Sequence, residues 1–157
     1  MATEIERKFL VDHKKWDLFK KPPGELYKQG YLLNDEKCTI RIRLTESSGF
    51  ITLKGGTTGI SRSEFEYAVP LQDANQILDE LALSSVEKIR YPVNYKGKLW
   101  EVDVFKGENK GLIVAEIELQ DENEYFELPE WVTKEVSNDM RFTNASLSVS
   151  PYKYWEK

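Results

Sequence analysis

Acidic residues recur in this 157-residue chain as pairs that are separated by a single position. In an extended strand, residues i and i+2 point to the same side, so each pair would present two carboxylates together. Grouped carboxylates are the ligands that hard divalent cations such as Mg²⁺, Mn²⁺ or Ca²⁺ prefer. The pairs are Glu4 with Glu6, Glu64 with Glu66, and Glu116 with Glu118, and Asp103 adds a further carboxylate within an alternating segment.

Basic residues show the same spacing on other segments. Arg41 is followed by Arg43 and Lys88 by Arg90, while Lys54 ends a further alternating stretch. The planar fork of an Arg side chain fits phosphate oxygens in a bidentate way. Bases and carboxylates in one cavity would therefore suit a polyphosphate together with a divalent metal.

The alternation by itself has a second interpretation, an antiparallel sheet with one solvated, charged face. Such a face usually mixes Thr, Gln and Ser with its charges, whereas here acids and bases occupy different segments. Buried ion pairs rarely repay their desolvation, so many of them indicate function rather than stability. We therefore expect the charged face to line an enclosed site.

Composition excludes several other kinds of site. Cys38 is the only cysteine and His13 the only histidine, so neither a Cys cluster nor a His-rich metal site can form. The net charge is 22 − 27 = −5, which disfavours general nucleic-acid binding. The longest apolar run, Leu112 to Ala115, is far too short to span a membrane. With a lone thiol and no secretion signal near the start, we expect a cytoplasmic protein.

The elements that must position these residues are mostly strands, because apolar and polar residues alternate with a period of two. The length favours a single domain over residues 1–157. Eight antiparallel strands can close into a barrel that holds one small ligand, and an inward charged face would make it a polar tunnel. The expected strands are Thr3–Leu10, Leu26–Leu33, Cys38–Thr45, Phe50–Lys54, Ser63–Pro70, Val86–Tyr95, Lys98–Phe105 and Leu112–Leu119.

Helices are expected to be few and packed outside the barrel. Apolar residues at helical spacing predict a helix over Asp73–Leu83, with Asp73 as its N-cap. A short helix is expected over Asp12–Phe19, capped by Asp12, and another in the tail between Asn144 and Trp155.

The segment Glu4-Ile-Glu6-Arg-Lys8 resembles the N-terminal signature of the CYTH superfamily, the triphosphate tunnel metalloenzymes. Further segments resemble the family in the same order, and the length is similar to that of short bacterial members. These segments begin at Gln29, Arg41, Thr52, Arg62, Lys88, Trp100 and Val114.

The resemblance implies an eight-stranded tunnel and a role for each charged residue. Phosphate contacts would come from Lys8, Arg41, Arg43, Lys54, Lys88 and Arg90. A basic residue of the tail, Arg141 or else Lys153, would lie near the tunnel mouth. Catalytic roles would fall to Glu4, Lys8, Tyr31 and Glu116, although Tyr31 could equally be structural. Ligands for Mg²⁺ or Mn²⁺ would come from Glu4, Glu6, Glu64, Glu66, Asp103, Glu116 and Glu118.

The activity that the resemblance implies is metal-dependent hydrolysis of a triphosphate, with a small polyphosphate as partner. Inorganic tripolyphosphate is favoured, because no extra domain is present to recognise an organic moiety. The alternatives are an organic triphosphate such as thiamine triphosphate or a nucleotide, cyclisation of ATP as in class IV adenylate cyclases, and polyphosphate binding without turnover. The sequence leaves the oligomeric state open.

Overall fold

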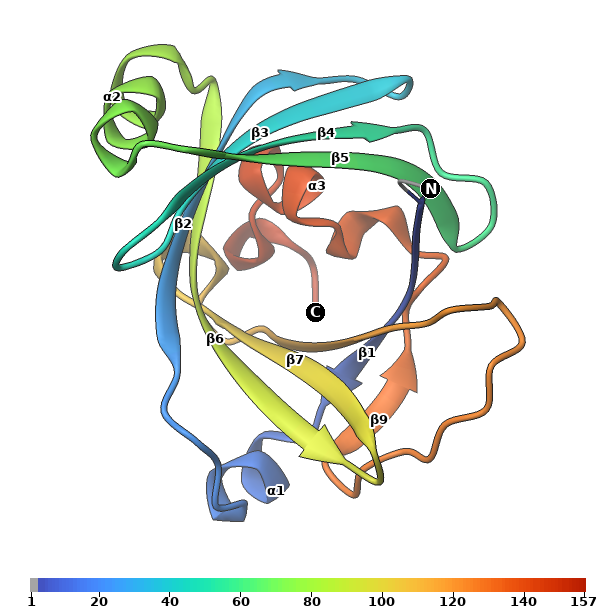
Figure 1. Cartoon of the computed structure of the whole chain (residues 1–157). Coiled ribbons are helices and arrows are strands. Elements are labelled where there is room, and N and C mark those ends of the chain that lie inside the picture. The colour runs from blue at the N-terminus through green and yellow to red at the C-terminus, as the bar shows by residue number, and fades with distance from the viewer. Residues whose placement is uncertain (1–2) are drawn as a thin grey trace.

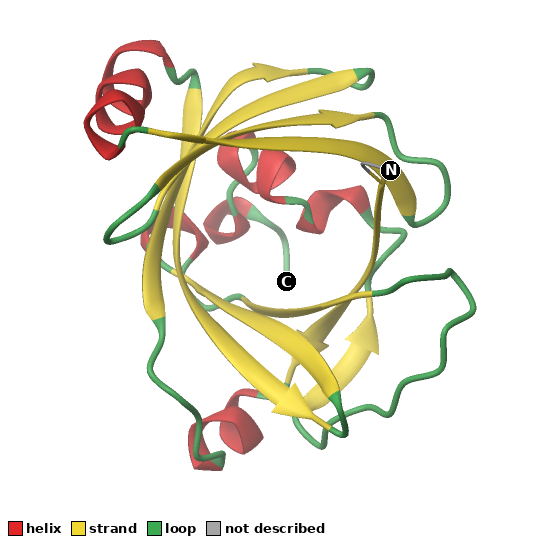
Figure 2. Cartoon of the chain, viewed as in Figure 1, coloured by secondary structure: helices red, strands yellow, loops and turns green. Residues whose placement is uncertain are grey.

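In the computed structural model, which describes residues 3–157, eight strands form a closed antiparallel barrel and a ninth lies beside it (Figures 1 and 2). The expected mainly β fold, an antiparallel barrel with few helices, is confirmed. The strands are β1 (Thr3–Val11), β2 (Glu25–Asn34), β3 (Cys38–Leu44), β4 (Gly49–Gly55), β5 (Ser61–Val69), β6 (Ser84–Tyr95), β7 (Lys98–Phe105), β8 (Ile113–Glu118) and β9 (Val132–Glu135).

The first strand closes the barrel by pairing on both of its edges. One edge of β1 pairs with β8, with Glu6 opposite Glu118 and Lys8 opposite Glu116. On the other edge, its first residues pair with β5 and its last residues with β9. The remaining strands continue from β5 in the order β4, β3, β2, β6, β7 and β8. Side chains alternate along each strand, and the paired acids and bases point to the inside of the barrel.

Most of the apolar packing lies on the outside of the barrel. The outward side chains of β1, β7 and β8, including Phe9, Trp100 and Ile117, are buried in one cluster with Trp16 and Trp131. Trp16 belongs to α1 (His13–Leu18), which covers this side. Helix α2 (Leu71–Leu81) packs on the outer face of β3 and β4. The polar interior is therefore compatible with a stable fold, because burial of apolar surface occurs elsewhere.

One end of the barrel is filled by the C-terminal segment. Here the inward face turns apolar at Val86, Phe105 and Val114, which pack against Phe142 and Leu147 of the tail. Figure 1 shows the C-terminal helices in red behind the barrel opening. This segment holds α3 (Asn144–Val149) between the 3₁₀ turns Met140–Phe142 and Tyr152–Tyr154, and a further turn spans Gly107–Asn109.

The expected elements form, with differences at their ends. The Asp12 carboxylate accepts a hydrogen bond from the Lys15 N–H at 3.0 Å, which confirms it as the cap of α1. Asp73 was wrong as a cap: α2 begins two residues earlier, after Pro70, and Asp73 lies in its first turn. There a carboxylate interacts favourably with the helix dipole. Strand β9 was not expected, because its four residues carry no apolar alternation.

Gly30 offers a test of the packing between β2 and α2. A Cβ at Gly30 would lie 2.4 Å from Leu78 Cδ1 and 2.7 Å from Ala82 Cβ, so Gly30→Ala must push the helix region away. We expect the free energy of unfolding in urea to fall by about 1–3 kcal/mol, as overpacked cores do. Gly55→Ala is the control, because its Cβ would meet no atom closer than 3.6 Å. Equal stability of Gly30→Ala and Gly55→Ala would contradict this view of the contact.

Candidate active site

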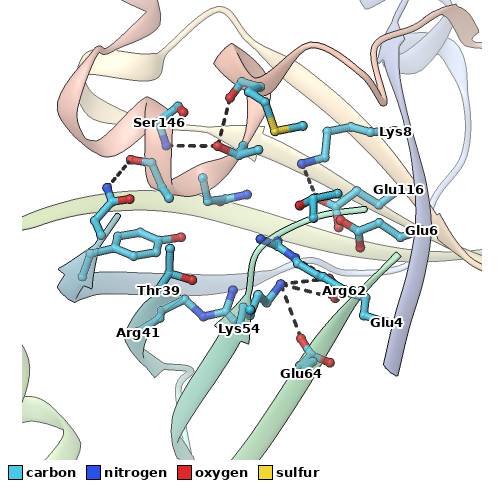
Figure 3. A pocket seen from close by; sticks show the side chains of 18 of the residues that line it. Glu4, Glu6, Lys8, Thr39, Arg41, Lys54, Arg62, Glu64, Glu116 and Ser146 are labelled. Carbon is cyan, nitrogen blue, oxygen red and sulfur yellow. Dashed lines mark hydrogen bonds and ion pairs between the residues drawn. The ribbon is translucent and has the colours of Figure 1, made fainter. Parts of the chain in front are cut away.

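The barrel encloses a cavity of about 770 Å³ to which all eight of its strands contribute side chains. Figure 3 shows acidic and basic side chains pointing into this space, with Lys8 near Glu116 and Lys54 near Glu4 and Glu64. The acids come mainly from β1, β5 and β8, and the bases from β3, β4 and β6. Such a cavity is large enough for a small polyanion, and its lining is charged rather than apolar.

The bases of β3 and β4 face carboxylates of β1 and β5. Lys54 Nζ lies 3.2 Å from a Glu4 oxygen and 3.4 Å from a Glu64 oxygen. Arg43 Nη2 lies 3.1 Å from Glu66, and Arg41 Nη2 donates to the Thr52 hydroxyl at 3.2 Å. These contacts hold the basic groups in place, while the cavity leaves them accessible to an anion.

Asp103 anchors a second set of bases, Lys88 and Arg90. Arg90 and Asp103 are directly opposite in the β6–β7 ladder. Arg90 donates through Nε and Nη2 to the two oxygens of Asp103 at 2.8 and 2.9 Å, and Lys88 Nζ donates to the same carboxylate at 2.8 Å. Burial lowers the pKa of Lys88 to about 8, although the negative charge of Asp103 acts in the opposite direction. Asp103 therefore orients two bases that line the cavity.

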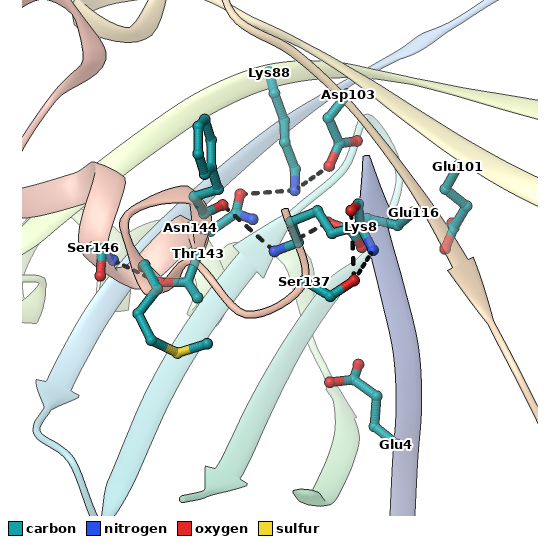
Figure 4. Close-up of polar contacts among 12 residues, drawn as sticks. Glu4, Lys8, Lys88, Glu101, Asp103, Glu116, Ser137, Thr143, Asn144 and Ser146 are labelled. Atoms are coloured by element: carbon teal, nitrogen blue, oxygen red, sulfur yellow. Dashed lines mark hydrogen bonds and ion pairs between the residues drawn. The ribbon is translucent and has the colours of Figure 1, made fainter. Parts of the chain in front are cut away.

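The tail also contacts the lysines of the site. Figure 4 shows Lys88 Nζ between Asp103 and Asn144, whose side-chain oxygen accepts a hydrogen bond at 2.8 Å. Lys8 Nζ lies 3.4 Å from the carbonyl oxygen of Phe142 and 3.8 Å from Glu116. The segment that fills one end of the barrel is thus in contact with two of the bases inside it.

The carboxylates of the cavity differ in how well their charge is balanced. Burial would raise the pKa of Glu4, but Lys54 and Arg62 outweigh it and lower that pKa to about 2. Burial likewise opposes ionisation of Glu116, and Lys8 and Arg90 still lower its pKa to about 2. Both groups are therefore ionised at neutral pH.

Glu6 and Glu118 are two carboxylates of the cavity whose ionisation is opposed by their surroundings. Burial, together with the charges of Glu116 and Glu4, raises the pKa of Glu6 to about 8. Burial and the nearby Glu4 also raise the pKa of Glu118. The two residues face each other across the β1–β8 ladder. Neither carboxylate forms an ion pair within residues 3–157.

This unbalanced pair fits a divalent cation, because a positive charge there would relieve the repulsion and the donors are all oxygen. Within the described chain, no three acidic, His or Cys side chains converge closely enough to hold a metal by themselves. Mg²⁺ commonly binds through one or two carboxylates and completes its shell with substrate phosphates and water. The donor set is consistent with that kind of binding.

Thirteen of the expected site residues line the cavity, and two do not. Asp103 is fully buried, and both of its oxygens accept hydrogen bonds from Lys88 and Arg90, so it is not positioned as a metal ligand. Arg141 lies outside the lining, because Asp139 pairs with it at 2.6 Å and Trp155 lies against its guanidinium. The thirteen are Glu4, Glu6, Lys8, Tyr31, Arg41, Arg43, Lys54, Glu64, Glu66, Lys88, Arg90, Glu116 and Glu118.

Fifteen lining residues were absent from the expected set, and four of them contact charged side chains of the site. Arg62 shares a face with Glu64 and Glu66, and Glu101 shares one with Asp103, so their spacing already carried a signal. Tyr27 likewise shares a strand face with Tyr31. Asn144 reaches the cavity from the tail, where no periodic pattern of residues predicts its position.

The CYTH domain model matches residues 2–149. The chain belongs to the CYTH family. This CYTH chain is 45% identical over 158 residues to an inorganic triphosphatase of Acetivibrio thermocellus, and the match covers 100% of both chains. It is also 35% identical over 156 residues to an inorganic triphosphatase of Nitrosomonas europaea, covering 94% of this chain and 98% of the relative.

A solved structure of the family has the same fold. The crystal structure of the inorganic triphosphatase NE1496 matches this CYTH chain with a TM-score of 0.66 and 32% identity, covering 96% of this chain and 97% of that one. Among residues 3–157, no helix is long and apolar enough to cross a membrane.

Replacement of Asp103 tests whether its carboxylate anchors Lys88 and Arg90. Asp103→Asn keeps the shape but removes the negative charge between two buried cations, and breaking such a pair typically costs about 3–5 kcal/mol. We expect a loss of that order in the free energy of unfolding by urea. Glu101→Gln is the matched control, since Glu101 pairs with the same Arg90 at 3.2 Å but is half-exposed, and exposed pairs contribute about 0–1 kcal/mol. Equal losses in the two variants would refute the anchoring role.

Proposed function

We propose that this chain is a metal-dependent triphosphatase that hydrolyses inorganic triphosphate to pyrophosphate and phosphate. The observation that carries the proposal is the cavity inside the closed barrel, where bases come mainly from β3, β4 and β6 and the carboxylate pair Glu6 and Glu118 comes from β1 and β8. The names of the two full-length relatives support the same reaction. We further infer that the chain acts as one domain, with a small polyphosphate as its partner and the cytoplasm as its location.

The basic wall would bind and orient the anionic chain. Arg41 and Arg43 present guanidinium groups from β3, while Lys54 and the anchored pair Lys88 and Arg90 contribute further donors. Phosphoryl transfer depends mainly on positioning and on stabilising charge, so a rigid set of donors is the main requirement. In this site the rigidity comes from ion pairs that each base already makes with the barrel.

The acidic wall would hold the metal, for which we propose Mg²⁺ or Mn²⁺. Glu6 and Glu118 are the principal candidates, and Glu4, Glu64 and Glu116 lie in the same cavity. When bound, the cation would neutralise phosphate charge and polarise the bond to be broken.

Glu4 and Glu116, which stay ionised, would also orient neighbouring bases. Glu4 contacts Lys54 at 3.2 Å, and Glu116 lies 3.8 Å from Lys8. Lys8 is well placed to stabilise charge that develops on the phosphate. Tyr31 is buried in the wall opposite Arg41 in the β2–β3 ladder, and we propose that it restrains that arginine.

The activity itself is tested by phosphate release from tripolyphosphate, ATP and thiamine triphosphate, with Mg²⁺, with Mn²⁺ or with a chelator, beside an assay for cyclic AMP. We expect rapid release from tripolyphosphate that needs the metal, and slower release from the organic triphosphates. The physical reason is that the cavity binds through phosphate charge. A preference for an organic triphosphate or cyclic AMP formation would reject the proposed substrate, and binding without turnover would reject the hydrolase activity.

A single substitution separates catalysis from folding. Glu116→Gln removes a charge from the acidic wall, and even residues that only orient metal ligands contribute about 10–100-fold. We therefore expect phosphate release to fall by about 100-fold or more, with thermal unfolding monitored to show that the barrel is intact. Glu80→Gln is the control, because Glu80 is exposed on α2 and its side chain contacts Gln76. A folded Glu116→Gln protein with normal turnover would contradict the assignment.

A further inference from the structure

Tyr27 lies between two arginines of the cavity. Its ring centroid is 5.2 Å from the Cζ atom of Arg43 and 5.1 Å from that of Arg90. Both distances are within the range of a cation–π interaction, in which a cation is attracted to the electron-rich face of an aromatic ring. Tyr27 also lines the cavity itself, so this arrangement is part of the candidate active site.

Strand order explains why one ring can reach both guanidinium groups. Strand β2 lies between β3, which carries Arg43, and β6, which carries Arg90. Gln29 is opposite Arg43 in one ladder and Glu25 is opposite Arg90 in the other. Tyr27, midway between Gln29 and Glu25, is thus a diagonal neighbour of both arginines, and long aromatic side chains reach diagonal positions.

The two arginines differ in how firmly other groups hold them. Arg90 is bound through Nε and Nη2 by Asp103 and through Nη1 by Glu101 at 3.2 Å. Arg43 contacts Glu66 through Nη2, but its buried Nε has no hydrogen-bond partner in the described chain. The ring of Phe50 also lies near Arg43, at 5.6 Å. The rings of Tyr27 and Phe50 therefore add restraint on Arg43 to that of its ion pair with Glu66.

Charge repulsion makes such a restraint necessary. Burial lowers the pKa of the Arg43 guanidinium, and the positive charges of Arg41 and Arg90 lower it further. A ring between Arg43 and Arg90 attracts both cations and keeps them apart. Without it, Arg43 could rotate away from Arg90 toward solvent, and the spacing of the two phosphate donors would be lost.

We propose that Tyr27 is a positioning residue that fixes the spacing between Arg43 and Arg90 and so presents them together to the phosphate chain. This role rests on the proposed function, since it assumes that both arginines bind phosphate. The required property is the aromatic ring and not the hydroxyl group.

Three variants of the full-length chain test the proposal. Tyr27→Phe keeps the ring, Tyr27→Leu removes it, and Tyr67→Leu is a control on the outer face of β5, where the side chain is exposed. Steady-state hydrolysis of tripolyphosphate with Mg²⁺ gives KM and kcat. Calorimetric titration of tripolyphosphate in the presence of a chelator gives a Kd that depends on neither metal nor turnover, and thermal unfolding reports on the fold.

We expect Tyr27→Leu to raise KM and the metal-free Kd about tenfold, equivalent to about 1.4 kcal/mol, while kcat changes far less. A rise in KM at nearly constant kcat indicates lost binding that is shared by the ground state and the transition state. Tyr27→Phe and Tyr67→Leu should both match the original chain, because neither disturbs the ring between the arginines. If Tyr27→Leu does not fold, Tyr27→Gln, which suits a polar cavity wall, takes its place with the same expectations.

Two results would overturn the role of the ring: an unchanged Kd in a folded Tyr27→Leu or Tyr27→Gln protein, or an equal loss in Tyr27→Phe. The titration also separates this proposal from the proposed function. If the original chain releases no phosphate but binds tripolyphosphate, and the Kd still rises in Tyr27→Leu alone, the hydrolase assignment fails and the positioning role stands.

Discussion

Charge balance inside a closed barrel is the constraint on which this structure depends. Two unit charges a few ångströms apart interact strongly where water is scarce, so bases gathered in one cavity must be held by nearby acids. Asp103 shows the strongest form of this, with two bases bound to one fully buried carboxylate. On β1 and β8, Glu6 and Glu118 show the reverse, because burial and neighbouring carboxylates oppose their ionisation. The same cavity is thus rigid at its basic wall and unbalanced at its acidic wall.

The barrel supports this interior by placing its apolar packing elsewhere. Aromatic residues such as Trp16, Trp100 and Trp131 bury the outer face of the barrel, and α2 covers β3 and β4. The interior becomes apolar at the end that the tail fills, around Phe142 and Leu147. Polar and apolar regions are therefore separated along the barrel axis as well as between its faces, and the charges are confined to the part that a ligand can enter.

Much of this arrangement is local information and could be predicted from sequence. The alternation of apolar and polar residues predicted the eight barrel strands. The separation of acids from bases indicated that the charged face is enclosed. Features that depend on which strands are neighbours could not be predicted in the same way. Asp103 is buried because the β6–β7 register sets it opposite Arg90. Tyr27 reaches two arginines because β2 lies between β3 and β6. Arg141 lies outside the cavity and pairs with Asp139, a contact that no periodic pattern reveals.

The pairing of β1 has a consequence for how the molecule folds. This strand precedes the other eight in the chain, yet its ladder partners are β5, β8 and β9, and the last two come from much later in the chain. Such long-range pairing must offset a large loop-closure entropy before it gains stability, and it slows folding. Glu6 and Lys8 consequently meet their partners on β8 only after most of the chain has been synthesised. The charged interior is complete only when β8 has joined β1 in the barrel.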